Sequence, residues 1–204
     1  MPPIILNVAR QTALITTLLC CVMPSAVSAE ITPRERQRLV AHLEMTESWL
    51  ADELSGLSQQ QLEFRRAPGS WTILEVFEHL IVVGPIYWND LQKAVKAGAA
   101  GRPVTNRDVD ILWYGIDRTN RETAISPENP PGKLRDLRAG FDAYRQQHAQ
   151  LLEYVKTTKD DLRNRVVERQ GSDAYQWALL ISTHEQRHIL QIREIKADPK
   201  FPQK

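Results

Sequence analysis

Four long segments of this 204-residue chain carry apolar residues every three or four positions, and this spacing is the strongest constraint on its fold. Residues with this spacing lie along one side of an α-helix and can be buried together. The segments cover residues 33–55, 72–97, 134–157 and 173–196. We expect no strands, because no segment alternates convincingly between apolar and polar residues. Four helices of similar length, each with one apolar side, predict an all-α protein built as a four-helix bundle.

Local signals indicate where the first two helices begin. Thr32 followed by Pro33 favours a helix start at that proline. Thr72 and Glu75 have the spacing of a capping box, which predicts that the second helix starts near Thr72. Pro85 lies inside the second helix and predicts a kink there.

A long segment, residues 98–133, separates the second helix from the third and is rich in glycine, proline and charge. Its middle, residues 108–114, is a candidate short helix. A crossover of this length between helices two and three predicts a bundle other than the plain up-down-up-down form. Long loops in compact domains are often functional. Trp113 and Tyr114 in this loop are candidates for the rim of a pocket or for apolar plugs over the end of the bundle.

The first 29 residues have the pattern of a secretory signal peptide. Arg10 precedes an apolar run over residues 12–23, and Val27-Ser28-Ala29 provides the residues that favour cleavage before Glu30. The apolar run is too short to span a bilayer comfortably. We therefore expect cleavage after Ala29 and a periplasmic or secreted protein with no membrane attachment. An uncleaved anchor and a lipoprotein are the alternatives.

The leader also contains both cysteines, Cys20 and Cys21. The mature chain would then have no disulfide, no thiolate metal ligand and no cysteine nucleophile. Because Arg10 is the only charged leader residue, the 26 Lys and Arg of the chain become 25, equal to the 25 Asp and Glu. Zero net charge gives no general reason to bind nucleic acid or an anionic membrane. The remaining residues, 30–204, have the size of one domain.

The sequence HEQRH, residues 184–188, places His184 and His188 four positions apart on one helix. Side chains with this spacing share a face and can bind one divalent metal. The string also matches the H-E-x-x-H signature of zinc peptidases, in which the glutamate is the general base. A peptidase needs a further downstream ligand, and Glu194 is turned by about 120° from the direction of His188. We therefore disfavour the peptidase and interpret Glu185 as supporting a ligand or solvated.

A third histidine, His79, lies on the apolar stripe of the second helix. If the second and fourth helices face each other, His79 joins His184 and His188 in the bundle core. Three neutral imidazoles leave at least one coordination position open, which is typical of catalytic metal sites. We therefore predict a metal site formed by these three residues. His148 is interpreted as a buried polar residue, with a fourth ligand or a base beside the ligands as alternatives, and His42 is left outside the ligand set.

Two motifs in this order resemble the DinB-like superfamily of metalloenzymes: residues 68–80, PGSWTILEVFEHL, and residues 184–192, HEQRHILQI. The resemblance extends over residues 34–196. It implies a four-helix bundle with a long connection between helices two and three. It also implies zinc, nickel or manganese held by His79, His184 and His188. Characterised members include thiol-dependent transferases and isomerases, and most are cytoplasmic, so the leader is a departure.

Together these features predict an exported DinB-like protein, residues 30–204, that uses a metal to activate water or a thiol for attack on a small molecule. The reaction would be of the hydrolase or thiol-dependent transferase type, with the catalytic residues unassigned. A non-catalytic metal-binding bundle is the main alternative, and an H-E-x-x-H zinc peptidase is a weaker one. Nitrogen ligands suit zinc, nickel, copper or iron, so the metal is left open. A homodimer is a further possibility, and no nucleic-acid or membrane partner is expected.

Overall fold

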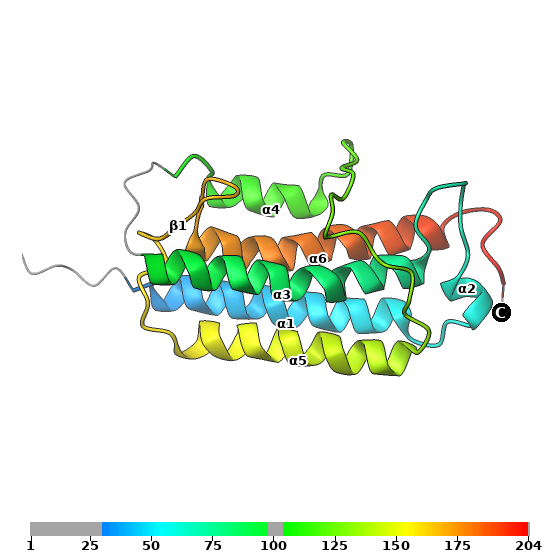
Figure 1. The fold of residues 1–204 in the computed structure, drawn as a ribbon, viewed down its shortest axis with the longest axis horizontal. Coiled ribbons are helices and arrows are strands. Elements are labelled where there is room, and N and C mark those ends of the chain that lie inside the picture. Colours follow the sequence, from blue (N-terminus) through cyan, green and yellow to red (C-terminus); the bar gives the residue numbers. More distant parts are fainter. Residues whose placement is uncertain (1–29, 98–103, 204) are drawn as a thin grey trace, which may run out of the picture.

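The computed structural model describes residues 30–97 and 104–203, and the predicted leader lies outside this range. Four long helices run side by side along the molecule (Figure 1). They are α1 (Pro33–Leu54), α3 (Ile73–Ala97), α5 (Leu137–Thr157) and α6 (Ala174–Lys196). Two short helices, α2 (Gln59–Leu62) and α4 (Asp108–Ile116), lie in the connections. The predicted all-α fold with four long helices is confirmed.

The predicted helix starts at Thr32 and Thr72 are formed by side-chain caps. The Thr32 hydroxyl accepts a hydrogen bond from the Glu35 N–H, and the Glu35 carboxylate accepts one from the Thr32 N–H. Thr72 and Glu75 make the same reciprocal pair ahead of α3. Each pair satisfies two N–H groups that a helix start leaves without partners. α3 then continues through Pro85 to Ala97, so this proline does not end the helix; the kink stays a prediction.

Helix α5 begins three residues later than the periodicity predicts, at Leu137 and not at Leu134. The buried Glu78 carboxylate of α3 accepts hydrogen bonds from the backbone N–H groups of residues 132, 133 and 134, at 2.6–2.7 Å. These N–H groups bind a carboxylate on another helix, and Asp136 caps the helix start. A contact with a residue about 55 positions away thus sets the start of α5.

The prediction that the chain has no strands is wrong in one place. β1 (Val166–Val167) and β2 (Ser172–Asp173) form an antiparallel pair in which Val166 faces Asp173. The pair lies between α5 and α6, and Gly171 occupies its turn with a φ of 63°. Strands of two residues are too short to show an alternating pattern, so the sequence carries no signal for them. The four-residue α2, capped by Ser58, was also not expected.

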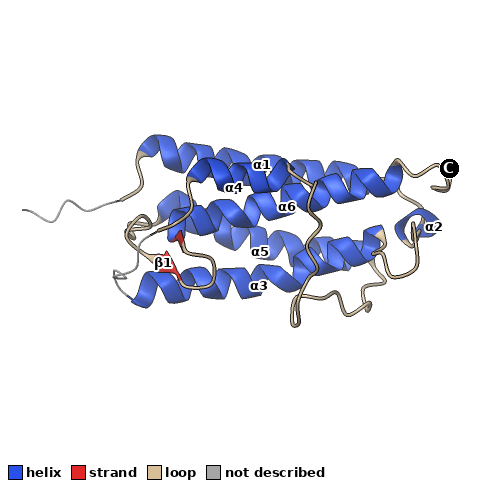
Figure 2. Cartoon of the chain, turned by 90° about the horizontal axis from the view of Figure 1, so that it is seen from above, coloured by secondary structure: helices blue, strands red, loops and turns tan. Residues whose placement is uncertain are grey.

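Helix α6 is the most enclosed of the long helices. It packs against α1, α3 and α4, whereas α5 packs against α1 and α3 on the other side of the bundle. Seen from above, α4 runs alongside α6 (Figure 2). Buried residues consequently occur on all sides of α6, and its buried polar residues include His184, Glu185, Arg187 and His188. A helix covered in this way can direct polar side chains into two separate interior regions.

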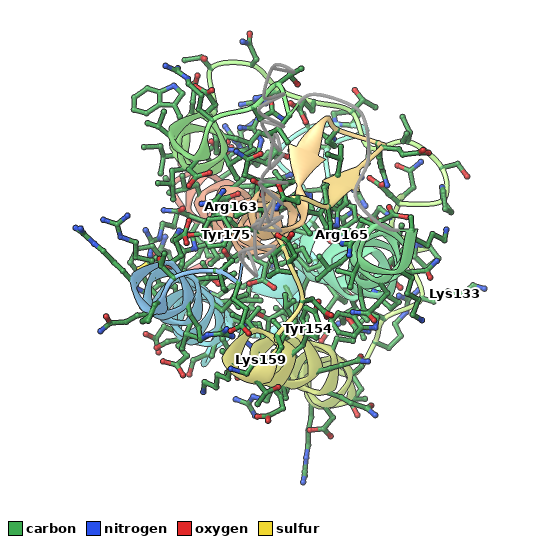
Figure 3. The ribbon with its side chains drawn as sticks, turned by 90° about the vertical axis from the view of Figure 1, so that its left-hand side faces the viewer. Lys133, Tyr154, Lys159, Arg163, Arg165 and Tyr175 are labelled. Carbon is green, nitrogen blue, oxygen red and sulfur yellow. The ribbon has the colours of Figure 1, made fainter. Side chains whose placement is uncertain are left out.

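One end of the bundle is tied together by Arg163 (Figure 3). Its guanidinium contacts Glu35 of α1 at 2.5 Å, Asp108 of α4 at 2.7 Å and Asp173, the N-cap of α6, at 3.0 Å. It also lies 3.8 Å from the ring centre of Tyr175. Arg163 therefore fixes α4 to the long helices. Over residues 30–97 and 104–203, no helix combines the length and the apolar character needed to cross a membrane.

Candidate metal centre

The structure brings together the three histidines of the predicted ligand set. His79 extends from α3, and His184 and His188 extend from adjacent turns of α6, which packs against α3. The Nε2 atom of His184 lies 3.3 Å from that of His79 and 3.1 Å from that of His188. One ligand atom from each residue lies within 4.8 Å of the other two. All three side chains are buried, so this cluster has the donor set and the compactness of a divalent-metal site.

Two of the three imidazoles are oriented through their other nitrogen. His79 Nδ1 donates a hydrogen bond to the backbone carbonyl of Glu128 at 2.6 Å. His188 Nδ1 donates one to the side-chain oxygen of Gln191 at 2.8 Å. A proton on Nδ1 leaves the Nε2 lone pair free, and hydrogen bonds of this kind typically orient metal-binding histidines. The donor atoms are therefore prepared for a cation.

Burial keeps these histidines neutral. Desolvation, followed by the charge of the neighbouring His79, lowers the pKa of His184 to about 3. Desolvation and the charge of His184 lower the pKa of His188 well below its usual range, and desolvation lowers that of His79. A neutral imidazole offers a lone pair, whereas a protonated one repels a cation. At neutral pH, protons therefore compete little for the cluster.

A cavity of about 580 Å³ opens beside the histidines. Trp71 forms part of its wall, with its ring centre 4.9 Å from that of His79 and 6.2 Å from that of His188. Tyr87 lies against His184 at 5.4 Å between ring centres. A cavity of this size holds a small molecule and is typical of ligand sites.

The rest of the cavity wall is strongly charged. Its arginines are Arg66, Arg118, Arg121, Arg169 and Arg187, and its acidic residues are Glu122, Glu128 and Glu194. The guanidinium of Arg187 donates to the carbonyls of Tyr114, Asp117 and Asn120, which connects α6 to the end of α4. Burial raises the pKa of Tyr87, and raises that of Tyr114 to about 12, so both phenols stay protonated at neutral pH.

Glu185 lies apart from the three-histidine cluster, and the structure corrects its interpretation. The carboxylate accepts a hydrogen bond from the Thr46 hydroxyl of α1 at 2.8 Å, and Tyr144 of α5 lies beside it. The side chain is buried, and desolvation raises its pKa to about 8. It is neither solvated nor bonded to a histidine of the cluster. Successive side chains on a helix differ by about 100°, which directs Glu185 to a different interior region from His184.

The other two histidines are also outside the cluster. His148 is buried, with Nε2 3.2 Å from the carbonyl oxygen of Leu43 and Nδ1 3.1 Å from a Glu47 carboxylate oxygen. This bears out its interpretation as a buried polar residue. His42 Nδ1 lies 2.8 Å from the Ser182 hydroxyl, so the His42 side chain makes a polar contact between α1 and α6.

The two aromatic candidates of the long connection have different positions. Tyr114 lines the cavity, as predicted for a rim residue. Trp113 is 60% exposed and does not line it. Both residues lie on α4, where adjacent side chains point about 100° apart, so only one of the two can face α6.

Several residues of the site were not predicted from the sequence, among them Trp71, Tyr87, Glu128, Gln191 and the arginines of the wall. Trp71 had a signal, because it lies within the same motif, residues 68–80, as His79. Gln191 also had one, since it follows His188 by three positions on the same helix. Glu128 had none, because it acts through its backbone carbonyl.

Comparison with known proteins gives two matches. A family model described as the DinB superfamily matches residues 36–192. The uncharacterized protein YuaE of Bacillus subtilis (strain 168) is 28% identical over 156 residues, which cover 74% of this chain and 91% of that protein. No solved structure matches the chain.

Proposed function

The chain belongs to the DinB superfamily, and we propose that it is a metal-dependent enzyme in which His79, His184 and His188 hold a divalent cation. The observation that carries this proposal is the position of three buried imidazoles beside a cavity of about 580 Å³. A purely structural metal site is normally closed by a fourth protein ligand. Here the described residues contribute three ligands, and the cavity gives a small molecule access to them.

The residues around the cluster support this role through orientation and exclusion of water. The carbonyl of Glu128 and the amide oxygen of Gln191 hold two imidazoles in a single tautomer. Trp71 and Tyr87 cover the imidazole rings with aromatic surface. When bound, a divalent cation on three neutral nitrogens supplies Lewis acidity, which lowers the pKa of a water or thiol that it ligates.

We propose that the reaction is a hydrolysis or a thiol-dependent transfer on a small molecule. The cavity volume supports a small substrate. The peptidase is not proposed, because Glu185 would have to act as the general base and its carboxylate bonds to Thr46 of α1. The alternative is a metal-binding bundle without turnover. It is favoured by Tyr87 and Tyr114 of the wall, because their raised pKa values keep both phenols protonated at neutral pH and leave no phenolate to accept a proton.

Metal binding is tested by elemental analysis and calorimetric titration of the purified protein. We expect about one divalent ion per chain, and a loss of affinity of at least about 100-fold in His184→Ala. His42→Ala is the matched control, because it removes a histidine of the bundle that lies outside the cluster. Equal metal binding by wild type and His184→Ala would exclude the proposed site.

Catalysis and export are tested separately from metal binding. A metal-loaded protein that turns over none of a panel of esters, amides and thiol acceptors would favour the non-catalytic bundle. We also propose that the chain is exported after cleavage at Ala29, which N-terminal sequencing of the protein from its native host checks by finding Glu30 first. The homodimer remains a proposal that the mass in solution tests. Neither nucleic acid nor membrane is proposed as a partner.

A further inference from the structure

Three guanidinium groups surround one carboxylate at the edge of the metal cavity. Arg118 binds Glu194 through two nitrogens, with Nε 2.6 Å from Oε1 and Nη2 3.3 Å from Oε2. Arg66 and Arg121 approach the same Oε2 atom, each at 3.8 Å. Arg66 comes from the loop after α2 and Arg121 from the connection after α4. Two segments far apart in the sequence therefore bring cations to Glu194, which lines the cavity.

Arg66 and Arg121 retain unused hydrogen-bond donors. A separation of 3.8 Å is too long for a hydrogen bond, so neither of them donates to Glu194. Arg66 donates from Nε alone, to Asp198 at 3.3 Å. Arg121 makes no hydrogen bond within the described residues, and its side chain is 73% exposed. Because a guanidinium carries five N–H groups, most donors of this pair are free to bind a ligand.

The charge of the cavity wall favours an anion. Five arginines and three glutamates line it. Asp198 and Asp90, which pair with Arg66 and Arg169, lie outside the lining. Arg187 is buried, and among the described residues no carboxylate lies within 4.0 Å of its guanidinium, which bonds to carbonyl oxygens. Its charge therefore remains uncompensated beside the histidines, where a divalent cation would add to it.

A role in stability alone accounts poorly for this arrangement. Exposed ion pairs contribute little to the free energy of unfolding. Arg118 already satisfies both oxygens of Glu194. Arg66 and Arg121 add repulsion between like charges without adding a hydrogen bond to that carboxylate. The pair is better suited to a ligand that accepts hydrogen bonds from both.

We propose that the substrate of this cavity carries an oxyanion, a carboxylate or a phosphate, that Arg66 and Arg121 bind while its other end reaches the histidines. This inference rests on the proposed function for the reacting end. Glu194 follows His188 by six residues on α6, so the two levels are about 9 Å apart along the helix axis. The substrate is therefore a small molecule whose anionic group lies on the order of 9 Å from its reacting atom. The planar fork of an arginine matches the oxygens of either anion.

The test uses calorimetry with three probes on protein from which a chelator has removed metal. The probes are succinate, inorganic phosphate and succinamide, which is the neutral counterpart of succinate. We expect one of the two anions to bind at least about 10-fold more tightly than succinamide, and the preference to shrink with added salt. The stronger anion identifies the oxyanion. Affinities of all three probes within twofold of one another would overturn the proposal.

The variant Arg66→Gln/Arg121→Gln tests the residues. We expect it to lose the preference for the anion while its affinity for succinamide is unchanged. Arg145→Gln is the matched control, because Arg145 is also exposed and lies 3.8 Å from one carboxylate, that of Glu47 on the other side of the bundle. Arg66→Lys/Arg121→Lys keeps the charge and should retain part of the preference, which separates charge from misfolding. An unchanged preference in the glutamine variant would overturn the assignment.

The same titrations on metal-loaded protein separate this inference from the proposed function. An arginine-dependent anion preference in a protein that binds no metal would support the inference and remove the metalloenzyme. A protein that binds metal at the histidines but shows no arginine-dependent preference would keep the metal site and overturn the inference.

Discussion

At the scale of single residues, the orientation of the histidines depends on acceptors that contribute no ligand atom. Gln191 accepts a hydrogen bond from His188 Nδ1, and the carbonyl of Glu128 accepts one from His79 Nδ1. Only the side chain of Gln191 can be removed by substitution. Substitution of Gln191 therefore measures how much the orientation of the His188 ring contributes to metal affinity.

We predict that Gln191→Met lowers metal affinity by about 10- to 100-fold, because His188 loses the partner that sets its tautomer and ring position. Competition with a chromophoric chelator measures the change. Gln150→Met on the exposed side of α5 is the control and should leave affinity unchanged. An affinity of Gln191→Met equal to that of wild type would mean that packing alone orients the ring.

A second prediction at this scale concerns Glu185 and the dependence of folding stability on pH. Its folded-state pKa of about 8 lies above the usual value of 4.5, because burial disfavours the charged form. Between these values the folded protein binds the proton and the unfolded chain does not. The contribution of Glu185 to stability is therefore fully present below about pH 4.5 and is lost as pH rises through about 8.

We predict that Glu185→Gln, which stays neutral at every pH, loses less stability than wild type between pH 6 and 9. Urea unfolding at a series of pH values measures this difference. The same variant should bind metal as wild type does, because the carboxylate bonds to Thr46 and not to the cluster. A folded Glu185→Gln variant that no longer binds metal would show that Glu185 contributes to the metal site.

At the scale of elements, close packing of α4 on α6 shapes one side of the cavity. Gly115 of α4 lies so near α6 that an added Cβ would be 2.9 Å from the Thr183 Cβ and 3.0 Å from the Thr183 carbonyl oxygen. Neither atom can move without moving α6. Tyr114, the neighbour of Gly115, lines the cavity and its carbonyl binds Arg187. The position of α4 therefore affects the site directly.

We predict that Gly115→Ala destabilises the protein by about 1–3 kcal/mol through overpacking against α6. Gly84→Ala on α3 is a matched control. Its Cβ would meet the end of the flexible Gln147 side chain, which can rotate away. The helix gain from glycine to alanine, about 0.5–1 kcal/mol, should then offset most of the cost. Chemical denaturation compares the two, and equal stabilities would contradict the close packing of α4.

At the scale of the whole molecule, the proposed metal between α3 and α6 would link binding to folding. The three imidazoles come from two helices and converge only in the folded chain. An ion that binds the folded state and not the unfolded chain stabilises it by mass action, by about 4 kcal/mol at 1,000 times the dissociation constant.

We therefore predict that a divalent ion raises the melting temperature and that a chelator lowers it again, as followed by differential scanning fluorimetry. Because the folded-state pKa of each histidine is lowered, protons bind the unfolded chain more tightly. The metal-free protein should consequently lose stability as pH falls below about 6.5. His184→Ala should show a much smaller rise in melting temperature at the same metal concentration; a rise equal to that of wild type would place the ion elsewhere.

The sequence alone determined the class of fold and the pairing of His184 with His188. Periodic apolar residues require helices whose apolar sides meet, and His184 and His188 share a face through their spacing alone. The caps at Thr32 and Thr72 are local signals as well. These features were predictable because each depends on residues within a few positions of one another.

Tertiary structure alone decided the surroundings of the histidines. The Glu128 carbonyl reaches His79 from 49 residues away, and a backbone carbonyl has the same chemistry in every residue. No local spacing links Arg66 to Arg121, and only the fold brings both to Glu194. Glu185 was misread because periodicity identifies the buried side of a helix but not which neighbour covers it. Long-range contacts therefore bring His79 to the pair and determine what the cluster can do, whereas local spacing determines only that His184 and His188 share a face.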